Sequence, residues 1–219
     1  AGNTGSNSRL KPGAKEPVHL YVNDFDGNGQ TETVMTYYVK GREIPFSNYE
    51  EMTKALPIIK KHYLLASNFA KASAADLLGK EKMEKSIVRT ADAFESVYLE
   101  NIGPGLNFKV HVLPDELQWS TLNATALADL DGDGRKEVIL GGNFYECNIE
   151  MGRYDNNYGN VLSIGKDGAM QVAPLGDLRI KGQVRRIRPV TIKAQICFIL
   201  ARNDEACLVI RPAKSPRVQ

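Results

Sequence analysis

The sequence has little of several features that mark special classes of protein. Its three cysteines are an odd number without metal-ligand spacing, so they provide no disulfide framework. The longest apolar run, residues 196–201, has six residues and is far too short to span a membrane. Lysine and arginine (28) nearly balance aspartate and glutamate (26), without the basic excess of a nucleic-acid-binding protein. These absences argue against a disulfide scaffold, a transmembrane protein and a nucleic-acid-binding protein.

The remaining composition is that of a soluble globular protein. Hydrophobic residues make up 42% of the chain and charged residues 25%, and 219 residues are enough to bury a core. Residues 1–7 are polar and turn-like, so we expect no signal peptide within this sequence. Length alone allows one or two domains, and the pattern described below favours a single domain over 1–219.

Two segments, 18–35 and 123–140, have the same plan. Each contains an alternating or apolar strand, an acidic glycine-rich loop and a second strand with β-branched residues. Residues 141–144 (Gly-Gly-Asn-Phe) close the second segment, and residues 1–4 (Ala-Gly-Asn-Thr) resemble this closing element without the strand before it. Internal repeats of this kind govern the fold. We therefore expect the chain to begin part-way through a repeat, as a C-terminal fragment of a longer protein.

Between the repeats, residues 48–91 have the spacing of short amphipathic helices. We expect a first helix capped by Asn48 or Ser47, a second with Pro57 at its first position, and two more at 69–78 and 80–88 on either side of Gly79. Apolar residues recur every three or four positions, which predicts one buried stripe on each helix. We interpret this segment as an insertion packed against the sheets. A partner-docking element is the alternative.

The rest of the chain has the pattern of short strands joined by turns. We expect three hairpins, formed by 94–99 with 108–113, 160–164 with 170–173, and 195–201 with 206–210. Short consecutive strands at near-regular spacing predict an antiparallel all-β architecture, either a sandwich or a propeller.

The two acidic loops follow the pattern acid-x-acid-Gly-acid/amide-Gly-x-x-Glu. Side-chain oxygens at positions one, three, five and nine, with the carbonyl oxygen of position seven, form a hard-oxygen ligand set suited to Ca²⁺. The expected ligands are Asp24, Asp26, Asn28, the Gln30 carbonyl and Glu32 in the first loop, and Asp129, Asp131, Asp133, the Arg135 carbonyl and Glu137 in the second. Glycines at positions four and six permit the positive-φ bends that such a loop needs. We therefore predict two Ca²⁺ sites.

Other interpretations of the loops fit less well. An EF-hand needs a glutamate at position twelve and flanking helices, whereas position twelve is Met35 or Leu140 and strands follow. Mg²⁺ demands strict octahedral geometry and keeps its waters. An acidic turn without a metal remains the alternative. Because Asn28 is uncharged, we expect weaker binding in the first loop. Neither loop is accompanied by a histidine, cysteine or nucleophile, so we expect a structural metal.

At these loops the sequence resembles the FG-GAP/VCBS repeats of integrin-α-type β-propellers, and more closely the VCBS-repeat, ASPIC/UnbV-type surface proteins of Bacteroidetes. The likeness covers nearly the whole chain, and the segments that support it are 21–26, 69–72, 78–82, 140–145, 151–155 and 158–159. The resemblance implies a mainly β fold: a partial propeller of about three four-stranded antiparallel blades, with a helical insertion at about 48–91 and Ca²⁺ bound between strands. Residues 184–212 depart from the pattern, because 188–192 stand where an acidic loop would lie.

The resemblance also implies a function. The chain would be a calcium-binding propeller segment of an exported or cell-surface protein, periplasmic or anchored to an outer membrane as a lipoprotein, that binds a protein or a glycan. The remaining blades of the parent protein, or another chain, would cover its open edges. We expect no enzymatic activity.

Two other functions stay open at this point. One is a propeller enzyme that acts on polysaccharide, which would need two carboxylates about 5 to 9.5 Å apart outside the metal loops. The candidates are Asp92, Glu95, Asp115 and Glu116. The other is one piece of a multi-chain assembly. Three aromatic residues could stack on sugars, although we favour a place at a seam between blades: Tyr145, Tyr154 and Tyr158.

Overall fold

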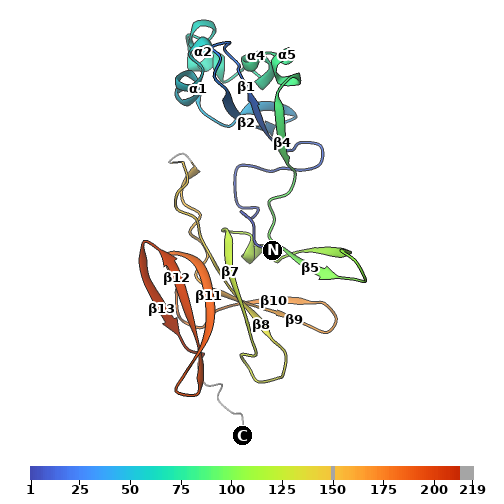
Figure 1. The fold of residues 1–219 in the computed structure, drawn as a ribbon, viewed down its shortest axis with the longest axis vertical. Coiled ribbons are helices and arrows are strands. Elements are labelled where there is room, and N and C mark those ends of the chain that lie inside the picture. The colour runs from blue at the N-terminus through green and yellow to red at the C-terminus, as the bar shows by residue number, and fades with distance from the viewer. Residues whose placement is uncertain (149–150, 213–219) are drawn as a thin grey trace. The chain divides into compact units, whose positions relative to one another are not determined.

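The computed structural model describes residues 1–148 and 151–212. Backbone contacts divide the chain into two compact units: unit 1, formed by Ala1–Asn7 with Glu95–Gln219, and unit 2, formed by Ser8–Phe94. The described residues form four antiparallel sheets, of four, four, three and two strands, and one short helical segment (Figure 1). The prediction of a mainly β chain with a helical segment is confirmed.

Unit 2 contains a four-stranded sheet with the strand order β3-β2-β1-β4. Its strands are β1 Val18–Asn23, β2 Glu32–Val39, β3 Arg42–Pro45 and β4 Ile87–Ala91. The two-residue turn between β2 and β3, Lys40 and Gly41, has positive φ at both residues, which matches the twist of a hairpin. β4 follows the helices in sequence and pairs with the open edge of β1, so the four strands are not in consecutive order.

Five short helices lie between β3 and β4. They are α1 Tyr49–Ala55, α2 Pro57–His62, α3 Ala66–Phe69, α4 Ala74–Leu78 and α5 Lys80–Glu84. The side chain of Asn48 caps α1, and Pro57 is the first residue of α2. The predicted cap of the first helix and the predicted first residue of the second helix are both confirmed.

Two of the expected helices differ from those observed. The expected helix at 69–78 is divided, because α3 ends at Phe69 and Ser73 caps a new helix, α4. The expected helix at 80–88 is wrong beyond α5, because β4 begins at Ile87. The β-branched residues that follow favour a strand, and β1 offers an edge with which they pair.

The helices cover one face of the unit 2 sheet. Tyr21, Phe25 and Val34 share one core with the buried helical residues Met52, Leu56, Ile59, Phe69, Ala74, Leu78 and Met83. Burying one aliphatic side chain of this size stabilises a fold by about 1.5–3 kcal/mol. This packing supports the interpretation of the helical segment as an insertion that completes the core of unit 2.

Unit 1 contains the remaining strands. They are β5 Val97–Asn101, β6 Phe108–Val112, β7 Leu122–Ala128, β8 Glu137–Gly142, β9 Asn160–Ile164, β10 Met170–Pro174, β11 Gln183–Ile192, β12 Gln195–Asn203 and β13 Glu205–Ile210, with a 3₁₀ turn, η1, at Asp115–Leu117. The three expected hairpins are confirmed as β5–β6, β9–β10 and β12–β13.

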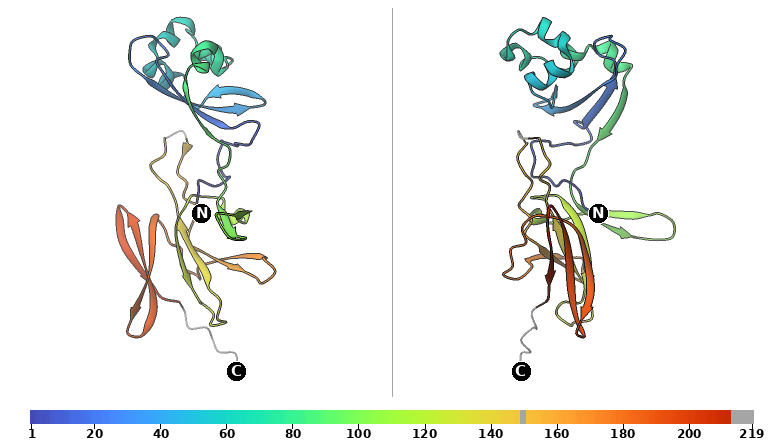
Figure 2. Two further views of the ribbon diagram at one scale, coloured as in Figure 1. Left: turned by 45° about the vertical axis from the view of Figure 1, so that its right-hand side comes forward. Right: turned by 60° about the vertical axis from the view of Figure 1, so that its left-hand side comes forward.

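Two sheets of unit 1 pack face to face. β7 to β10 form a four-stranded sheet in consecutive order, and residues of β11 and β12 pack against one of its faces (Figure 2). The side chains of β7 on this face are alanines, which let β11 approach closely. At Gly141 of β8 an added Cβ would lie 2.9 Å from Cγ1 of Val184, so a larger residue would displace β11.

The number of strands per sheet differs from the expectation of about three four-stranded sheets in consecutive order. Among the described strands, β7–β10 alone follow that plan. In unit 2 the fourth strand joins from the opposite edge, while β5–β6 and β11–β13 have two and three strands.

Candidate metal centres

The first acidic loop connects β1 to β2 and is organised by its own carboxylates. The Asp24 carboxylate accepts hydrogen bonds from the backbone N–H groups of Gly27 (2.7 Å) and Gly29 (2.8 Å). Oε2 of Glu32, at the start of β2, accepts a hydrogen bond from the Phe25 N–H (2.8 Å). These bonds draw the first and ninth positions of the loop together.

The second acidic loop, between β7 and β8, repeats these hydrogen bonds position by position. The Asp129 carboxylate accepts from the N–H groups of Gly132 (2.7 Å) and Gly134 (3.0 Å). Oε2 of Glu137 accepts from the Leu130 N–H (2.8 Å). The same local sequence therefore folds in the same way in two different units.

The loop glycines are needed for their backbone conformation. Their φ angles are +79° and +85° at Gly27 and Gly29, and +84° and +86° at Gly132 and Gly134. A Cβ at any of them would meet nothing within 4 Å. Glycine is therefore needed here for its backbone conformation and not because space is short. Other residues rarely adopt the left-handed region.

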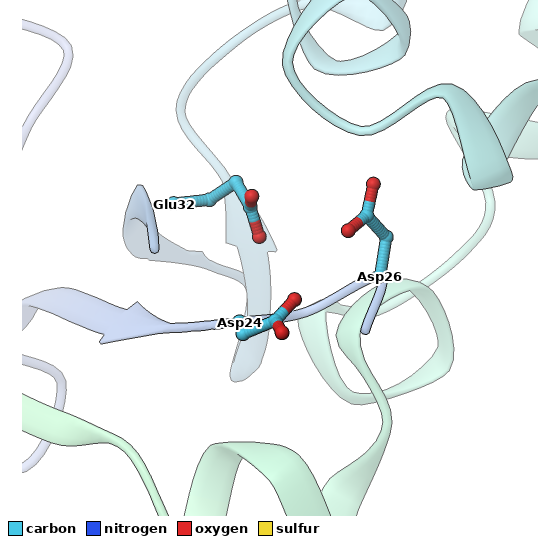
Figure 3. A group of neighbouring side chains, drawn as sticks. All are labelled: Asp24, Asp26 and Glu32. Carbon is cyan, nitrogen blue, oxygen red and sulfur yellow. The ribbon is translucent and has the colours of Figure 1, made fainter. Parts of the chain in front are cut away.

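Three carboxylates converge in each loop. Within each group, one oxygen from each residue lies within 4.8 Å of the other two; the groups are Asp24, Asp26 and Glu32, and Asp129, Asp131 and Glu137. We call them the first and second triads. Figure 3 shows the first, with two carboxylates on the loop and the third at the start of β2. Six of the ten predicted ligands are thus brought together.

The donor set of each triad fits calcium. Like charges at this separation repel one another, and a divalent cation between them would replace repulsion with attraction. Carboxylate oxygens are the hard ligands that Ca²⁺ prefers, and its six to eight ligands leave places for carbonyl oxygens and water beside a triad. Asp129 and Asp131 are exposed and Glu137 is buried, so the second triad is open to solvent on one side.

The fifth and seventh positions of the loops have other partners. Oδ1 of Asn28 accepts a hydrogen bond from the Gln30 N–H (2.7 Å), and Oδ1 of Asp133 accepts one from the Arg135 N–H (2.7 Å). The Arg135 guanidinium also donates to Oδ2 of Asp133, from Nε (2.8 Å) and Nη2 (2.6 Å). The loop pattern predicts a role for the Arg135 carbonyl alone, although opposite charges two residues apart in the sequence signal this pair.

The loops lower the pKa values of two of their carboxyl groups. Hydrogen bonds from the N–H groups of Gly29, Gly27 and Asn28 hold the pKa of Asp24 below its ordinary value, with a smaller contribution from the charge of Lys82. The side-chain and backbone hydrogen bonds of Arg135 lower the pKa of Asp133. These two acids are therefore ionised at neutral pH and remain so as the pH falls toward their ordinary values.

A residue outside the loop pattern supports the first triad. Nζ of Lys82, in α5, donates a hydrogen bond to the Phe25 carbonyl (2.6 Å). Its own carbonyl accepts one from Nδ2 of Asn23 at the end of β1 (2.7 Å). Sequence reasoning missed Lys82, because nothing in an isolated helical segment indicates which loop it contacts.

The acidic residues considered for glycoside hydrolysis lie in both units. Asp92 belongs to unit 2 and Glu95 to unit 1, while Asp115 and Glu116 lie in η1. Within 1–148 and 151–212, groups of three convergent His, Cys, Asp or Glu side chains occur at the two triads, and neither includes these four residues.

Two of the three tyrosines considered for sugar stacking, Tyr145 and Tyr158, contact residues that lead into β11. The Tyr145 hydroxyl accepts a hydrogen bond from the Gly182 N–H (3.1 Å), and the Tyr145 N–H donates to Oε1 of Gln183 (3.0 Å). The guanidinium of Arg179 lies 5.3 Å from the centre of the Tyr158 ring. These contacts join the segment after β8 to the segment before β11, and they support the place at a seam.

Comparison with known proteins adds no relative: no protein-family model matches the chain, and neither does any curated protein or solved structure. Among the described helices, none is both long and apolar enough to cross a membrane.

Proposed function

We propose that this chain is a calcium-binding β-propeller segment of an exported or cell-surface protein, in which each acidic loop holds one Ca²⁺. The observation that supports this most directly is the repetition of one arrangement in two units. Both loops have the same backbone hydrogen bonds and the same convergence of carboxylates at positions one, three and nine.

The role of the ion in this proposal is structural. Each triad contains residues from the loop after one strand and from the start of the next strand. A bound ion would therefore hold the two strands together at their connecting loop, at the edge of a core. A ligand that binds only the folded state stabilises it by about 2.7 kcal/mol when present at 100 times its dissociation constant. Two filled sites would therefore contribute a large share of the stability of a domain.

The arrangement of unit 1 supports the propeller part of the proposal. β7–β10 form a consecutive four-stranded sheet with the acidic loop between its first two strands, and β11 begins the next sheet and packs on its face. Successive blades of a propeller are related in this way. The binding of a protein or a glycan, and the surface location, are the roles that the family resemblance implies.

Calcium titration with matched variants tests the metal sites. We expect two ions per chain by isothermal titration calorimetry, and a higher unfolding midpoint in millimolar Ca²⁺ than in EDTA. Asp24→Asn and Asp129→Asn should each remove one ion from the stoichiometry and part of the midpoint rise. Asp92→Asn and Asp155→Asn, exposed acids outside both triads, are the controls in units 2 and 1.

Two outcomes of this titration would contradict the proposal. If calcium and EDTA give the same unfolding midpoint and no binding heat is detected, the loops are acidic turns without a metal. If all four variants lower binding to the same extent, the effect is that of net charge and the triads are not specific sites.

A further inference from the structure

The first acidic loop contains Asn28 followed by Gly29, the sole Asn-Gly pair among the 219 residues. In such a pair the backbone nitrogen of the glycine can attack the side-chain amide carbon of the asparagine, because glycine has no Cβ to obstruct the approach. The attack closes a five-membered imide ring, and hydrolysis of the ring leaves an acid where the amide was. The second loop has Asp133 and Gly134 at the same positions, without an amide to lose.

The attacking nitrogen is held by a carboxylate. Oδ2 of Asp24 accepts a hydrogen bond from the Gly29 N–H at 2.8 Å. This nitrogen must lose its proton when it forms the new bond, and a base about 2.6–3.2 Å away is within reach of that proton. Oδ1 of Asp24 accepts hydrogen bonds from the N–H groups of Gly27 (2.7 Å) and Asn28 (3.1 Å), which fix the position of the carboxylate.

The side-chain carbonyl of Asn28 is held by the loop as well. Its Oδ1 accepts a hydrogen bond from the Gln30 N–H at 2.7 Å. Attack at the amide carbon moves negative charge onto this oxygen, and a donor that is already in place lowers the energy of the charged intermediate. The loop therefore supplies a proton acceptor on one side of the new bond and a donor to the oxygen on the other.

The pair is also accessible to water. Asn28 and Gly29 are both exposed, so water can reach the imide ring and ammonia can leave. Within residues 1–148 and 151–212, Nδ2 of Asn28 donates no hydrogen bond that would hold it in place. The departing group is therefore not retained by a neighbouring side chain or carbonyl.

We propose that Asn28 is a site of spontaneous deamidation and that the folded loop promotes the reaction. The Gly29 nitrogen forms a bond to Cγ of Asn28, and the Cγ–Nδ2 bond breaks. The proton of the Gly29 N–H passes by way of the Asp24 carboxylate to the departing nitrogen, which leaves as ammonia. Water then opens the imide, so the overall reaction consumes one water molecule and releases one molecule of ammonia.

The imide can open in two ways. Attack of water at Cγ restores the peptide bond and leaves an aspartate, which gives the first loop the acid that Asp133 supplies in the second. Attack at the other carbonyl leaves an isoaspartate, in which the main chain passes through the side chain and gains one atom. The reaction does not depend on metal binding, so the experiments are made in EDTA. Deamidation without calcium binding would leave this inference intact and overturn the proposed metal site.

Asn101 is a matched control within the same chain. It is exposed, and its Oδ1 accepts a hydrogen bond from the Gly103 N–H (3.2 Å), two residues further on, as in the first loop. The nitrogen that would attack belongs to Ile102, whose β-branched side chain obstructs the approach. The Ile102 N–H donates to the Asn107 carbonyl (3.0 Å), which is a far weaker proton acceptor than a carboxylate.

Peptide mapping by mass spectrometry, after incubation of the folded chain at neutral pH, measures the reaction. We expect Asn28 to be converted about tenfold faster than Asn101 or more, because a placed base and a placed donor each contribute to the rate. The products should include both aspartate and isoaspartate. Asn28→Gln should abolish the conversion at this position, since the longer side chain would have to close a six-membered ring.

Two alanine variants test the part that the loop plays. Asp24→Ala should slow the conversion of Asn28 roughly threefold or more, since water replaces the carboxylate only in part. Asp26→Ala removes the same charge from the same loop. Its carboxylate accepts from the Asn28 N–H (3.1 Å) and not from that of Gly29, so most of the rate should remain.

Three results would overturn the inference. Equal rates at Asn28 and Asn101 would show that the pair is not a site of modification. Unchanged or faster conversion in Asp24→Ala would show that an open loop reacts and that the folded loop does not promote the reaction. Equal losses in Asp24→Ala and Asp26→Ala would assign the effect to charge or loop stability and would remove Asp24 from the reaction.

Discussion

At the scale of single residues, Arg135 changes the charge balance between the two acidic loops. Its guanidinium holds one oxygen of the Asp133 carboxylate through two N–H groups. Such a charge-assisted pair competes with a cation for the same carboxylate. The first loop has the neutral Asn28 at this position. The extra negative charge of the second loop is therefore offset within the loop, and the affinity difference predicted from Asn28 alone becomes smaller.

Removing this guanidinium should strengthen calcium binding. We expect Arg135→Ala to raise the affinity of the second loop roughly threefold to tenfold at low ionic strength, because it exposes a carboxylate beside a divalent ion. Lys136→Ala removes a neighbouring positive charge that is not the ion-pair partner of Asp133, and it should have a smaller effect. Calorimetric titration measures both. An unchanged or lower affinity in Arg135→Ala would show that the pair organises the loop more than it competes with the ion.

Asn143 is a buried polar centre with an unusual backbone conformation. Its φ is +85°, and its side chain is 1% exposed. Oδ1 accepts hydrogen bonds from Oγ of Ser120 (2.8 Å) and the Asn157 N–H (2.9 Å), while Nδ2 donates to the carbonyls of Asn157 (2.8 Å) and Gly182 (3.0 Å). Asparagine suits this position because it tolerates a left-handed backbone and because its amide group can form all four of these hydrogen bonds.

Two substitutions at Asn143 separate the cost of the lost hydrogen bonds from the cost of backbone strain. Asn143→Gly and Asn143→Ala both leave buried groups without partners, which costs about 1–3 kcal/mol for each group. Asn143→Ala should cost about 1 kcal/mol more, because alanine is strained at positive φ and glycine is not. Urea denaturation of the two variants measures the difference. Equal stabilities would mean that backbone strain plays no part at this position.

At the scale of elements, α4 begins with a reciprocal cap. Oγ of Ser73 accepts a hydrogen bond from the Asp76 N–H, and the Asp76 carboxylate accepts from the Ser73 hydroxyl (2.7 Å) and N–H (2.8 Å). The Ser73 hydroxyl and N–H lower the pKa of Asp76 from its ordinary value of 3.8. The cap is therefore complete above this pH and is lost as the pH falls through the lower, folded value.

The cap should make unit 2 sensitive to acid. We expect Ser73→Ala to lower the free energy of unfolding by about 1 kcal/mol at pH 7, and by progressively less as the pH falls below about 3.8. Ser67→Ala, at an exposed position of α3, is the matched control and should have little effect at either pH. Urea denaturation at pH 7 and pH 3 measures the cost. A constant cost at both values would exclude ionised Asp76 as part of the cap.

At the scale of the whole molecule, unit 2 is one continuous segment, whereas unit 1 is formed by two. Val18 in β1 pairs with Ala91 in β4, so the chain enters and leaves the unit 2 sheet at adjacent points. The unit also has a core of its own. Adjacent ends and a separate core are the usual features of an inserted domain.

Unit 2 should therefore fold when it is excised. We expect residues 8–94 to unfold cooperatively by circular dichroism and to bind one calcium ion, since the first triad and its Lys82 support lie within this segment. Asp24→Asn in the excised unit should abolish binding without unfolding it. An excised segment without a cooperative transition would show that unit 2 depends on unit 1 for its core.

Features that depend on neighbours in sequence were predictable. The loop glycines, the three hairpins, the Asn48 cap and Pro57 at the start of α2 each depend on a few consecutive residues. The triads were predictable for the same reason. Hydrogen bonds from backbone N–H groups of the loop bring the carboxylates at positions one, three and nine of that loop together. Asp133 was less predictable, because the loop pattern indicates a metal ligand at this position and does not show that the Arg135 guanidinium pairs with its carboxylate.

By itself, then, the sequence determined a mainly β chain with two alike acidic loops and a helical segment, because short-range spacing and backbone conformation specify them. The tertiary structure decided which distant segments meet: β4 with β1, Lys82 with the first loop, and Ala1 with Val97. Such pairings depend on which edges and apolar faces are open after the local elements form. That choice is a property of the whole chain, and no single segment of sequence encodes it.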